Sequence, residues 1–194
     1  MKRINEEKID DAKYYEKIWS EEHNARPYYD AVRMRALIAP VKNGDKVLDV
    51  GAGVFGAVQY LAEETKIMAE LHAVDQSYTA RDIVLKRAPQ INYKLSDVVE
   101  LPYEDGIFDV VMAGEIIEHM EDPAAFCEEL LRVTKPGGCV TLSTVDTHCE
   151  NAKLHGEYPE HIWEFEPKDL LDFFGSGATY STVGDYHFII CVKP

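Results

Sequence analysis

The chain has 194 residues, which is enough for one domain with a sizeable core and too few for two. Hydrophobic residues make up 46% and charged residues 28%, as is usual for a soluble globular protein. The formal net charge of −15 disfavours nucleic-acid partners, because an acidic surface repels phosphates. No apolar run is long enough to span a membrane, and the first residues lack the apolar core of a signal peptide, so we expect a cytoplasmic protein.

Residues 1–40 are predicted to be largely helical. Apolar and aromatic side chains recur at helical spacing from Tyr14 to Trp19 and again from Tyr29 to Leu37. Two interpretations are open: these helices pack on the core, or they form a lid over a ligand. We treat residues 1–40 as an N-terminal helical lid and residues 41–194 as the main domain.

Short apolar strands alternate with helices along the rest of the chain. Helices are predicted at 57–64, 82–87, 123–133 and 167–174, with a sharp turn at Lys135–Gly138. Strands are predicted at 46–50, 71–74, 91–95, 108–113, 140–144, 179–183 and 187–192. This alternation predicts an α/β fold with a mostly parallel sheet and helices on both of its faces.

A glycine-rich turn follows the first of these strands and precedes a helix. Gly51, Gly53 and Gly56 match the fingerprint of dinucleotide-binding proteins, and Asp75 stands at the distance of the ribose-binding acid. Taken alone, these features are typical of an NAD(P)-dependent oxidoreductase. Asp49 argues for another ligand, because a carboxylate just before the glycines would repel a pyrophosphate and would suit an ammonium or sulfonium group.

Acidic residues stand at or just beyond the carboxyl ends of four predicted strands. They are Asp49, Asp75, Asp97 and Glu115. One such acid could cap a helix, but ligands of open α/β sheets bind at this edge, so four in succession favour a ligand site. Asp97 is suited to accept a hydrogen bond from an adenine amine.

With three later motifs, these features resemble the class I S-adenosylmethionine-dependent methyltransferases over residues 40–145. The motifs are Phe-Asp-Val-Val at 108–111, Glu-Ile-Ile-Glu-His-Met-Glu-Asp-Pro at 115–123 and Arg-Val-Thr-Lys-Pro-Gly-Gly at 132–138. The resemblance implies a Rossmann-like seven-stranded sheet whose last strand is antiparallel. It also implies methyl transfer from S-adenosylmethionine to a small-molecule acceptor, leaving S-adenosylhomocysteine. A non-catalytic cofactor-binding subunit, like the oxidoreductase, stays open as an alternative.

The resemblance also implies which residues hold the cofactor. The methionine portion would lie on Asp49, Gly51, Ala52 and Gly53, the ribose on Asp75 and Gln76, the adenine on Asp97 and Val98, and the sulfonium above Gly114, Glu115 and Ile116. One position departs from the family pattern. Phe55 stands where relatives commonly have a third glycine, and its side chain would either shift the loop or pack beside the ligand.

Three residues are candidates for catalysis. His119 follows the fourth strand and is the first candidate for a general base, with Glu118 and His161 as further candidates. The alternative for His119 is a packing role at a helix start. Glu115-x-x-Glu118-His119 and Glu160-His161 also resemble the metal-dependent ubiquinone-biosynthesis O-methyltransferases and the enzymes that methylate the 2′-hydroxyl at small-RNA 3′ ends. That resemblance implies a divalent ion, which would orient and acidify an acceptor hydroxyl.

Two further segments bear on the ligands. Residues 146–166 carry several histidines and aromatic residues and are too short for a separate substrate domain, which favours a small or medium acceptor. The residues concerned are His148, His155, Tyr158, His161 and Trp163. Before the first strand stand Arg26, Arg33 and Arg35, one of which is a candidate for the cofactor carboxylate.

Overall fold

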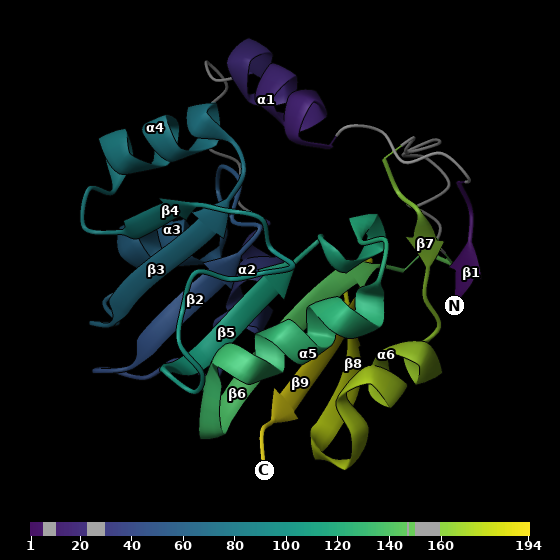
Figure 1. Cartoon of the computed structure of the whole chain (residues 1–194). Coiled ribbons are helices and arrows are strands. Elements are labelled where there is room, and N and C mark those ends of the chain that lie inside the picture. The colour runs from purple at the N-terminus through teal and green to yellow at the C-terminus, as the bar shows by residue number, and fades with distance from the viewer. Residues whose placement is uncertain (6–10, 23–29, 147, 150–159) are drawn as a thin grey trace.

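The computed structural model describes residues 1–5, 11–22, 30–146, 148–149 and 160–194 (Figure 1). Within that part of the chain, no helix is long and apolar enough to cross a membrane. His155, Tyr158 and Arg26, named above as candidates near the ligands, lie outside the described residues.

The central sheet has seven strands in the order β4-β3-β2-β5-β6-β9-β8. The strands are β2 (Lys46–Val50), β3 (Glu70–Asp75), β4 (Asn92–Leu95), β5 (Phe108–Gly114), β6 (Thr134–Val145), β8 (Ala178–Val183) and β9 (Tyr186–Val192). The last strand, β9, is antiparallel to both of its neighbours, and the other pairings are parallel. The predicted fold class, with its antiparallel last strand, is confirmed.

Helices cover both faces of the sheet, as predicted. On one face lie α2 (Ala31–Leu37), α3 (Ala57–Glu64) and α4 (Tyr78–Arg87), and on the other lie α5 (Pro123–Val133) and α6 (Pro167–Phe174) (Figure 1). Capping explains several boundaries. Asp122 accepts a hydrogen bond from the Ala125 N–H and Pro123 opens α5, while a capping box and Pro167 open α6.

Alternate residues of the inner strands enter two separate apolar clusters. Leu48 and Val111 face the cluster under α5 and α6, whereas Val47 and Met112 face the cluster under α2, α3 and α4. All four side chains are buried. The inner strands are therefore apolar on both faces, which is why the sequence shows continuous hydrophobic runs in place of alternation.

The N-terminal residues form several elements with different surroundings. Helix α1 (Asp11–Glu22) lies beside α4, past the carboxyl ends of the strands (Figure 1). In contrast, α2 buries Met34 and Leu37 in the core. A short strand, β1 (Lys2–Arg3), pairs with β7 (Trp163–Glu164), which joins the N-terminus to the segment before α6. Two short 3₁₀ turns complete the elements, η1 (Ile117–His119) and η2 (Gly175–Gly177).

The predicted turn at Lys135–Gly138 is wrong. These residues belong to β6, and the pairing of β5 with β6 shifts register between Phe108 and Val110 at this point. Gly137 takes a φ of +76°, and its N–H donates to the Lys193 carbonyl, 2.8 Å away. The glycines thus permit a bulge within a continuous strand where their pattern indicated a chain reversal.

Candidate active site

A cavity of about 570 Å³ opens at the carboxyl ends of β2, β3 and β5. Every residue predicted to hold the cofactor lies on its wall: Asp49, Gly51, Ala52, Gly53, Asp75, Gln76, Asp97, Val98, Gly114, Glu115 and Ile116. Tyr15 and Trp19 of α1 and Arg33 of α2 complete the lining on the other side. The order of the strands reverses beside β2, which is where open α/β sheets leave room for a ligand.

The glycines of the turn after β2 stand where a side chain would not fit. Gly51 and Gly53 have φ values of +69° and +50°. A Cβ on Gly51 would lie 2.0 Å from Cδ1 of Ile116, and a Cβ on Gly56 would lie 2.5 Å from the Ala52 carbonyl oxygen. Backbone at these positions therefore forms part of the cavity wall itself, where a ligand can approach it closely.

Asp49 lies beneath the glycine turn and is only 3% exposed. Its Oδ2 accepts a hydrogen bond from the Val58 N–H, 3.0 Å away, at the start of α3. Burial raises the pKa of this carboxyl to about 7, against the lowering effect of the Val58 and Ala57 N–H groups. A cationic ligand in the cavity would stabilise the charged form, so the site favours positive charge here.

Asp75 ends β3 and holds two backbone groups of the neighbouring turns. Its Oδ2 accepts from the Gly53 N–H and its Oδ1 from the Ser77 N–H, each at 2.9 Å. Burial raises its pKa. After β4, the Oδ1 of Asp97 accepts from the Val99 N–H at 3.2 Å, and Val98 is buried. Asp75 and Asp97, which follow neighbouring strands, thus both line the cavity and both hold backbone N–H groups of their turns.

Glu115 follows β5 with a φ of +55°, an uncommon conformation for a residue with a side chain. Its Oε1 accepts a hydrogen bond from Oγ of Ser143 at 2.9 Å and lies 3.7 Å from Nη1 of Arg33. Burial and the nearby Glu118 raise its pKa. The Arg33 guanidinium also lies 5.3 Å from the centre of the Tyr186 ring. Of the two candidate arginines that the structure describes, Arg33 lines the cavity and Arg35 does not.

His119 lies on the cavity wall with a defined tautomer. Its Nδ1 is 3.0 Å from the Glu160 carbonyl oxygen, which can only accept, so Nδ1 carries the hydrogen. In the neutral ring, Nε2 then accepts a hydrogen bond from the Tyr15 hydroxyl at 3.3 Å. The nitrogen with a lone pair therefore faces α1 and the cavity.

Glu118 and His161 lie behind His119, and neither is among the residues of the cavity wall. His161 meets His119 edge-on with ring centres 4.9 Å apart, and burial together with His119 lowers its pKa to about 4. Glu118 is 1% exposed, and burial raises its pKa against a lowering contribution from the Thr144 hydroxyl. Neither carboxyl oxygen makes a hydrogen bond of full geometry with the described residues. One ligand atom from each of Glu118, His119 and His161 lies within 4.8 Å of the others.

Phe55 keeps the backbone conformation of a glycine. Its φ is +67°, its N–H donates to Oε1 of Gln59 at 2.9 Å, and its ring lies 5.9 Å from the Arg87 guanidinium. Phe55 is also one of the residues that line the cavity. The departure at this position thus places an aromatic residue on the cavity wall while the loop keeps its left-handed conformation.

Sequence reasoning did not single out the residues that dock α1 onto the site. Glu16 accepts hydrogen bonds from the Ser77 and Thr79 hydroxyls at the start of α4, the first at 2.6 Å. These bonds lower the pKa of Glu16, with the Ser77 hydroxyl contributing most. The only signal for this arrangement was the amphipathic spacing of residues 14–19, which does not say which polar residue makes the contact.

Comparison with known proteins places the chain in a family. The family model described as "Methyltransferase domain" matches residues 48–142. The chloroplastic tocopherol O-methyltransferase of Arabidopsis thaliana is 36% identical over 133 residues, which are 66% of this chain and 36% of that protein. The 2-methyl-6-phytyl-1,4-hydroquinone methyltransferase of Synechocystis is 33% identical over 145 residues, 73% of this chain and 43% of that protein. The chain therefore spans less than half the length of these two curated relatives.

A solved structure agrees on the fold. Phosphoethanolamine N-methyltransferase 2 of Haemonchus contortus, in complex with phosphomonomethylethanolamine and S-adenosylhomocysteine, superposes with a TM-score of 0.70 at 16% identity. The match covers 95% of this chain and 59% of that one. On the family model, the curated relatives and this fold, the chain belongs to the class I S-adenosylmethionine-dependent methyltransferases.

Proposed function

We propose that this protein transfers a methyl group from S-adenosylmethionine to a small-molecule acceptor. The observation that carries the proposal is the meeting of all the predicted cofactor residues on one cavity of about 570 Å³. That volume suits a cofactor with a small acceptor beside it. The names of the curated relatives support acceptors of phenol or hydroquinone type.

In this proposal each part of the cofactor meets a matching group. The carboxylates of Asp49 and Glu115 offset the positive charge of the ammonium and sulfonium groups. The Asp75 carboxylate accepts hydrogen bonds from the ribose hydroxyls, and the Gln76 amide can donate to them as well. Asp97 and the Val98 backbone bind the adenine. Arg33, which lies beside Glu115, is the candidate partner of the cofactor carboxylate.

The methyl group of a sulfonium is already activated, so the protein mainly aligns the acceptor, the methyl carbon and the sulfur in a line. If the acceptor nucleophile must lose a proton, His119 is the candidate base, since its Nε2 carries the lone pair. Glu118 and His161 would then act through His119. His161, with its lowered pKa, is neutral at pH 7.

Calorimetric titration with S-adenosylhomocysteine tests the cofactor assignment. We expect binding of S-adenosylhomocysteine and no heat with NADH, because Asp49 disfavours a pyrophosphate at the glycine turn. The variant Asp75→Asn should weaken the binding by at least tenfold, whereas the control variant Asp82→Asn, on the exposed side of α4, should not. Binding of NADH alone would reverse the assignment in favour of an oxidoreductase.

Turnover needs a separate assay. Transfer of labelled methyl from S-adenosylmethionine to a panel of phenols, hydroquinones and amines distinguishes an enzyme from a non-catalytic cofactor-binding subunit. We expect product with at least one of them, and that product identifies the methylated atom. The cytoplasmic location and the lack of a nucleic-acid partner stay predictions from the sequence.

A metal-assisted transfer is a second candidate, favoured by the cluster of Glu118, His119 and His161. The fit is chemical as well as spatial. The buried Glu118 carboxylate makes no hydrogen bond of full geometry with the described residues and has only the Thr144 hydroxyl nearby, which is costly, and a cation would stabilise it. One carboxylate and two imidazoles suit a divalent ion such as Zn²⁺ or Mn²⁺, which would supply charge to lower the pKa of an acceptor hydroxyl.

Two measurements test the metal. Titration with Zn²⁺ and Mn²⁺ should show one site, which Glu118→Gln removes and His148→Ala, on the exposed surface, leaves intact. Chelation should then abolish methyl transfer, and added ion should restore it. Transfer that is indifferent to chelator, in a protein that binds no ion, would reject this candidate and leave the methyltransferase proposal standing.

A further inference from the structure

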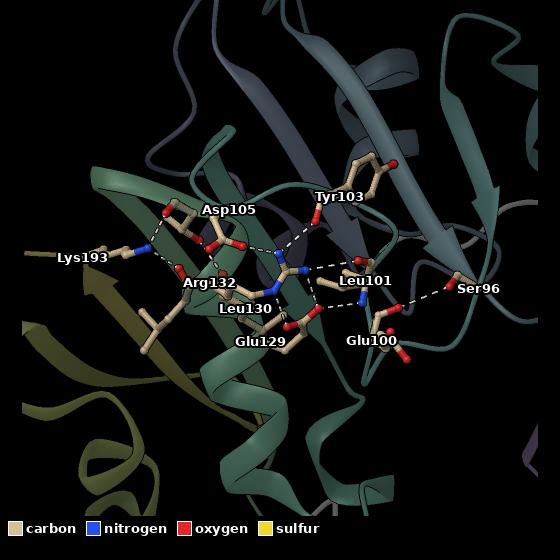
Figure 2. Close-up of polar contacts among 11 residues, drawn as sticks. Ser96, Glu100, Leu101, Tyr103, Asp105, Glu129, Leu130, Arg132 and Lys193 are labelled. Atoms are coloured by element: carbon tan, nitrogen blue, oxygen red, sulfur yellow. Dashed lines mark hydrogen bonds and ion pairs between the residues drawn. The ribbon is translucent and has the colours of Figure 1, made fainter.

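The loop between β4 and β5, residues 96–107, carries the proposed adenine site and is held from outside by α5 (Figure 2). At its start, the Ser96 N–H donates to the Asp75 carbonyl at 3.1 Å. Asp97 and Val98 follow directly and line the cavity. The rest of the loop runs back beside α5, where its backbone groups meet charged side chains of that helix (Figure 2).

Arg132, in the last turn of α5, uses each of its nitrogens. Nη2 donates to the Leu101 carbonyl at 3.2 Å and Nη1 donates to the Tyr103 carbonyl at 2.9 Å. Nη1 also bonds Oδ1 of Asp105 at 2.6 Å. Figure 2 shows these bonds radiating from one guanidinium to three points of the loop. Only a planar group with several fixed donors can make this set of bonds.

Glu129, one turn earlier in α5, closes the arrangement. Its carboxylate forms a two-pronged pair with Arg132, with Nε to Oε2 and Nη2 to Oε1 both at 2.7 Å. Its Oε1 also accepts from the Leu101 N–H at 2.6 Å. Both backbone groups of Leu101 are thereby bound to α5, three residues from Val98, and the Leu101 side chain is buried.

Exposure indicates which contacts matter. The Glu129 side chain is 12% exposed and that of Arg132 is 32% exposed, whereas Asp105 is 81% exposed. Solvent screens the bond to Asp105, so it contributes little. The two-pronged pair with Glu129 and the bonds to the Leu101 and Tyr103 backbone are the side-chain contacts by which α5 holds the loop. The Lys94 ammonium adds a bond from β4 to the Pro102 carbonyl, at 3.0 Å.

We propose that Arg132 and Glu129 are positioning residues for adenine recognition. By fixing Leu101 and Tyr103, they hold the Asp97 carboxylate where it accepts from the adenine amine and the Val98 N–H where it meets a ring nitrogen. This inference rests on the proposed function. Neither side chain lines the cavity, so each acts through the loop.

The test compares two ligands that differ at the adenine amine. S-adenosylhomocysteine carries the amine, and S-inosylhomocysteine has a carbonyl oxygen in its place, which Asp97 would repel. Calorimetry gives the ratio of their dissociation constants. In the unaltered protein we expect a preference for the adenine form of at least about tenfold, as a hydrogen bond to a charged group provides. Asp97→Asn should reduce that preference to near one.

Arg132→Gln should reduce the same ratio at least threefold, and in combination with Asp97→Asn it should add almost nothing. Arg132→Lys keeps the charge and loses the planar set of donors, so its ratio should fall between those of the unaltered protein and of Arg132→Gln. Glu129→Gln serves as a second variant if Arg132→Gln does not fold. Lys193→Gln is the matched control: Lys193 bonds the Leu131 and Thr134 carbonyls at the end of the same helix (Figure 2) but does not touch the loop.

The ratio separates positioning from stability. A variant that merely unfolds more easily loses affinity for both ligands alike, whereas a displaced Asp97 loses only the preference. An unchanged ratio in folded Arg132→Gln and Glu129→Gln would overturn the inference, as would an equal loss in Lys193→Gln. If the unaltered protein binds neither ligand, the proposed function fails, which is a different result from binding with an unaltered preference in the variants.

Discussion

At the scale of the residue, His119 is the group whose chemistry the surrounding contacts define most closely. The Glu160 carbonyl keeps the hydrogen on Nδ1, and the Tyr15 hydroxyl occupies Nε2. An acceptor that gives its proton to Nε2 must take the place of that hydroxyl. Tyr15 is therefore expected to move when the acceptor binds.

We predict that His119→Ala retains affinity for S-adenosylhomocysteine and loses about 10²- to 10⁴-fold in kcat, because it removes the proton acceptor and leaves the cofactor contacts in place. Steady-state kinetics measure this, with the acceptor that the methyl-transfer assay identifies. His148→Ala is the control, since His148 is exposed and paired with Glu166. Unchanged turnover in His119→Ala would leave His119 with a packing role only.

Phe55 shows how far single residues could be predicted from the sequence. The missing glycine was visible, but the sign of φ was not, because a left-handed residue with a side chain is set by its surroundings. Here the Gln59 side chain accepts a hydrogen bond from the Phe55 N–H, and the Arg87 guanidinium lies over the Phe55 ring. Similarly, the acids at the strand ends were predictable from their spacing, whereas the pairing of His119 with Tyr15 joins residues 104 apart.

At the scale of the element, the docking of α1 depends on one side chain. Glu16 accepts from Ser77 and Thr79, and the Ser77 N–H in turn donates to Asp75. Trp19 reaches the glycine turn, where its Cζ2 lies 3.1 Å from the position of a Cβ on Gly53. The covering helix and the proposed ribose carboxylate are thus attached to the same turn.

We predict that Glu16→Gln weakens S-adenosylhomocysteine binding about three- to tenfold, because the amide is a poorer acceptor for two hydroxyls and α1 covers the cavity less often. The change in tryptophan fluorescence on binding should shrink as well, since Trp19 lies on the cavity wall. Glu128→Gln, on the exposed side of α5, should alter neither signal. Equal affinities in both variants would show that α1 does not contribute to binding.

Element boundaries were predictable where the sequence carries caps. The helices at 57–64, 123–133 and 167–174 begin and end as predicted, with glycine or proline at their starts. The pairing of β1 with β7 was not predictable, because two-residue strands have no periodicity and their partners are about 160 residues away. The glycines of 135–138 were misread for a related reason: a bulge and a turn use the same residues.

At the scale of the molecule, buried acids make stability depend on pH. Burial raises the pKa of Asp49 to about 7, and it raises the pKa values of Glu115 and Glu118 as well. The folded state therefore binds more protons than the unfolded state between the ordinary carboxyl pKa and the raised one. Stability is then greatest at mildly acidic pH and is lost as pH rises through the raised values.

We predict that Tm of the ligand-free protein falls by about 5 °C or more between pH 5 and pH 8. Differential scanning calorimetry at high salt measures this, because salt screens the repulsion due to the net charge of −15 and leaves the buried groups unaffected. Glu118→Gln should flatten the dependence, as the amide does not titrate. A Tm that is constant or rises over this range would contradict the assignment of raised pKa values.

The docking of α1 has a consequence for the order of events in a catalytic cycle. A ligand at the glycine turn would lie beneath Tyr15 and Trp19, and its exchange on this side of the cavity would require the bonds of Glu16 to Ser77 and Thr79 to break. Undocking of one helix would then precede both the entry of fresh cofactor and the departure of the demethylated product. Because the Ser77 N–H also donates to Asp75, undocking of α1 would disturb the turn that orients the proposed ribose carboxylate. The residence time of the product in the cavity would then be set by the rate at which α1 undocks, independently of the rate of methyl transfer.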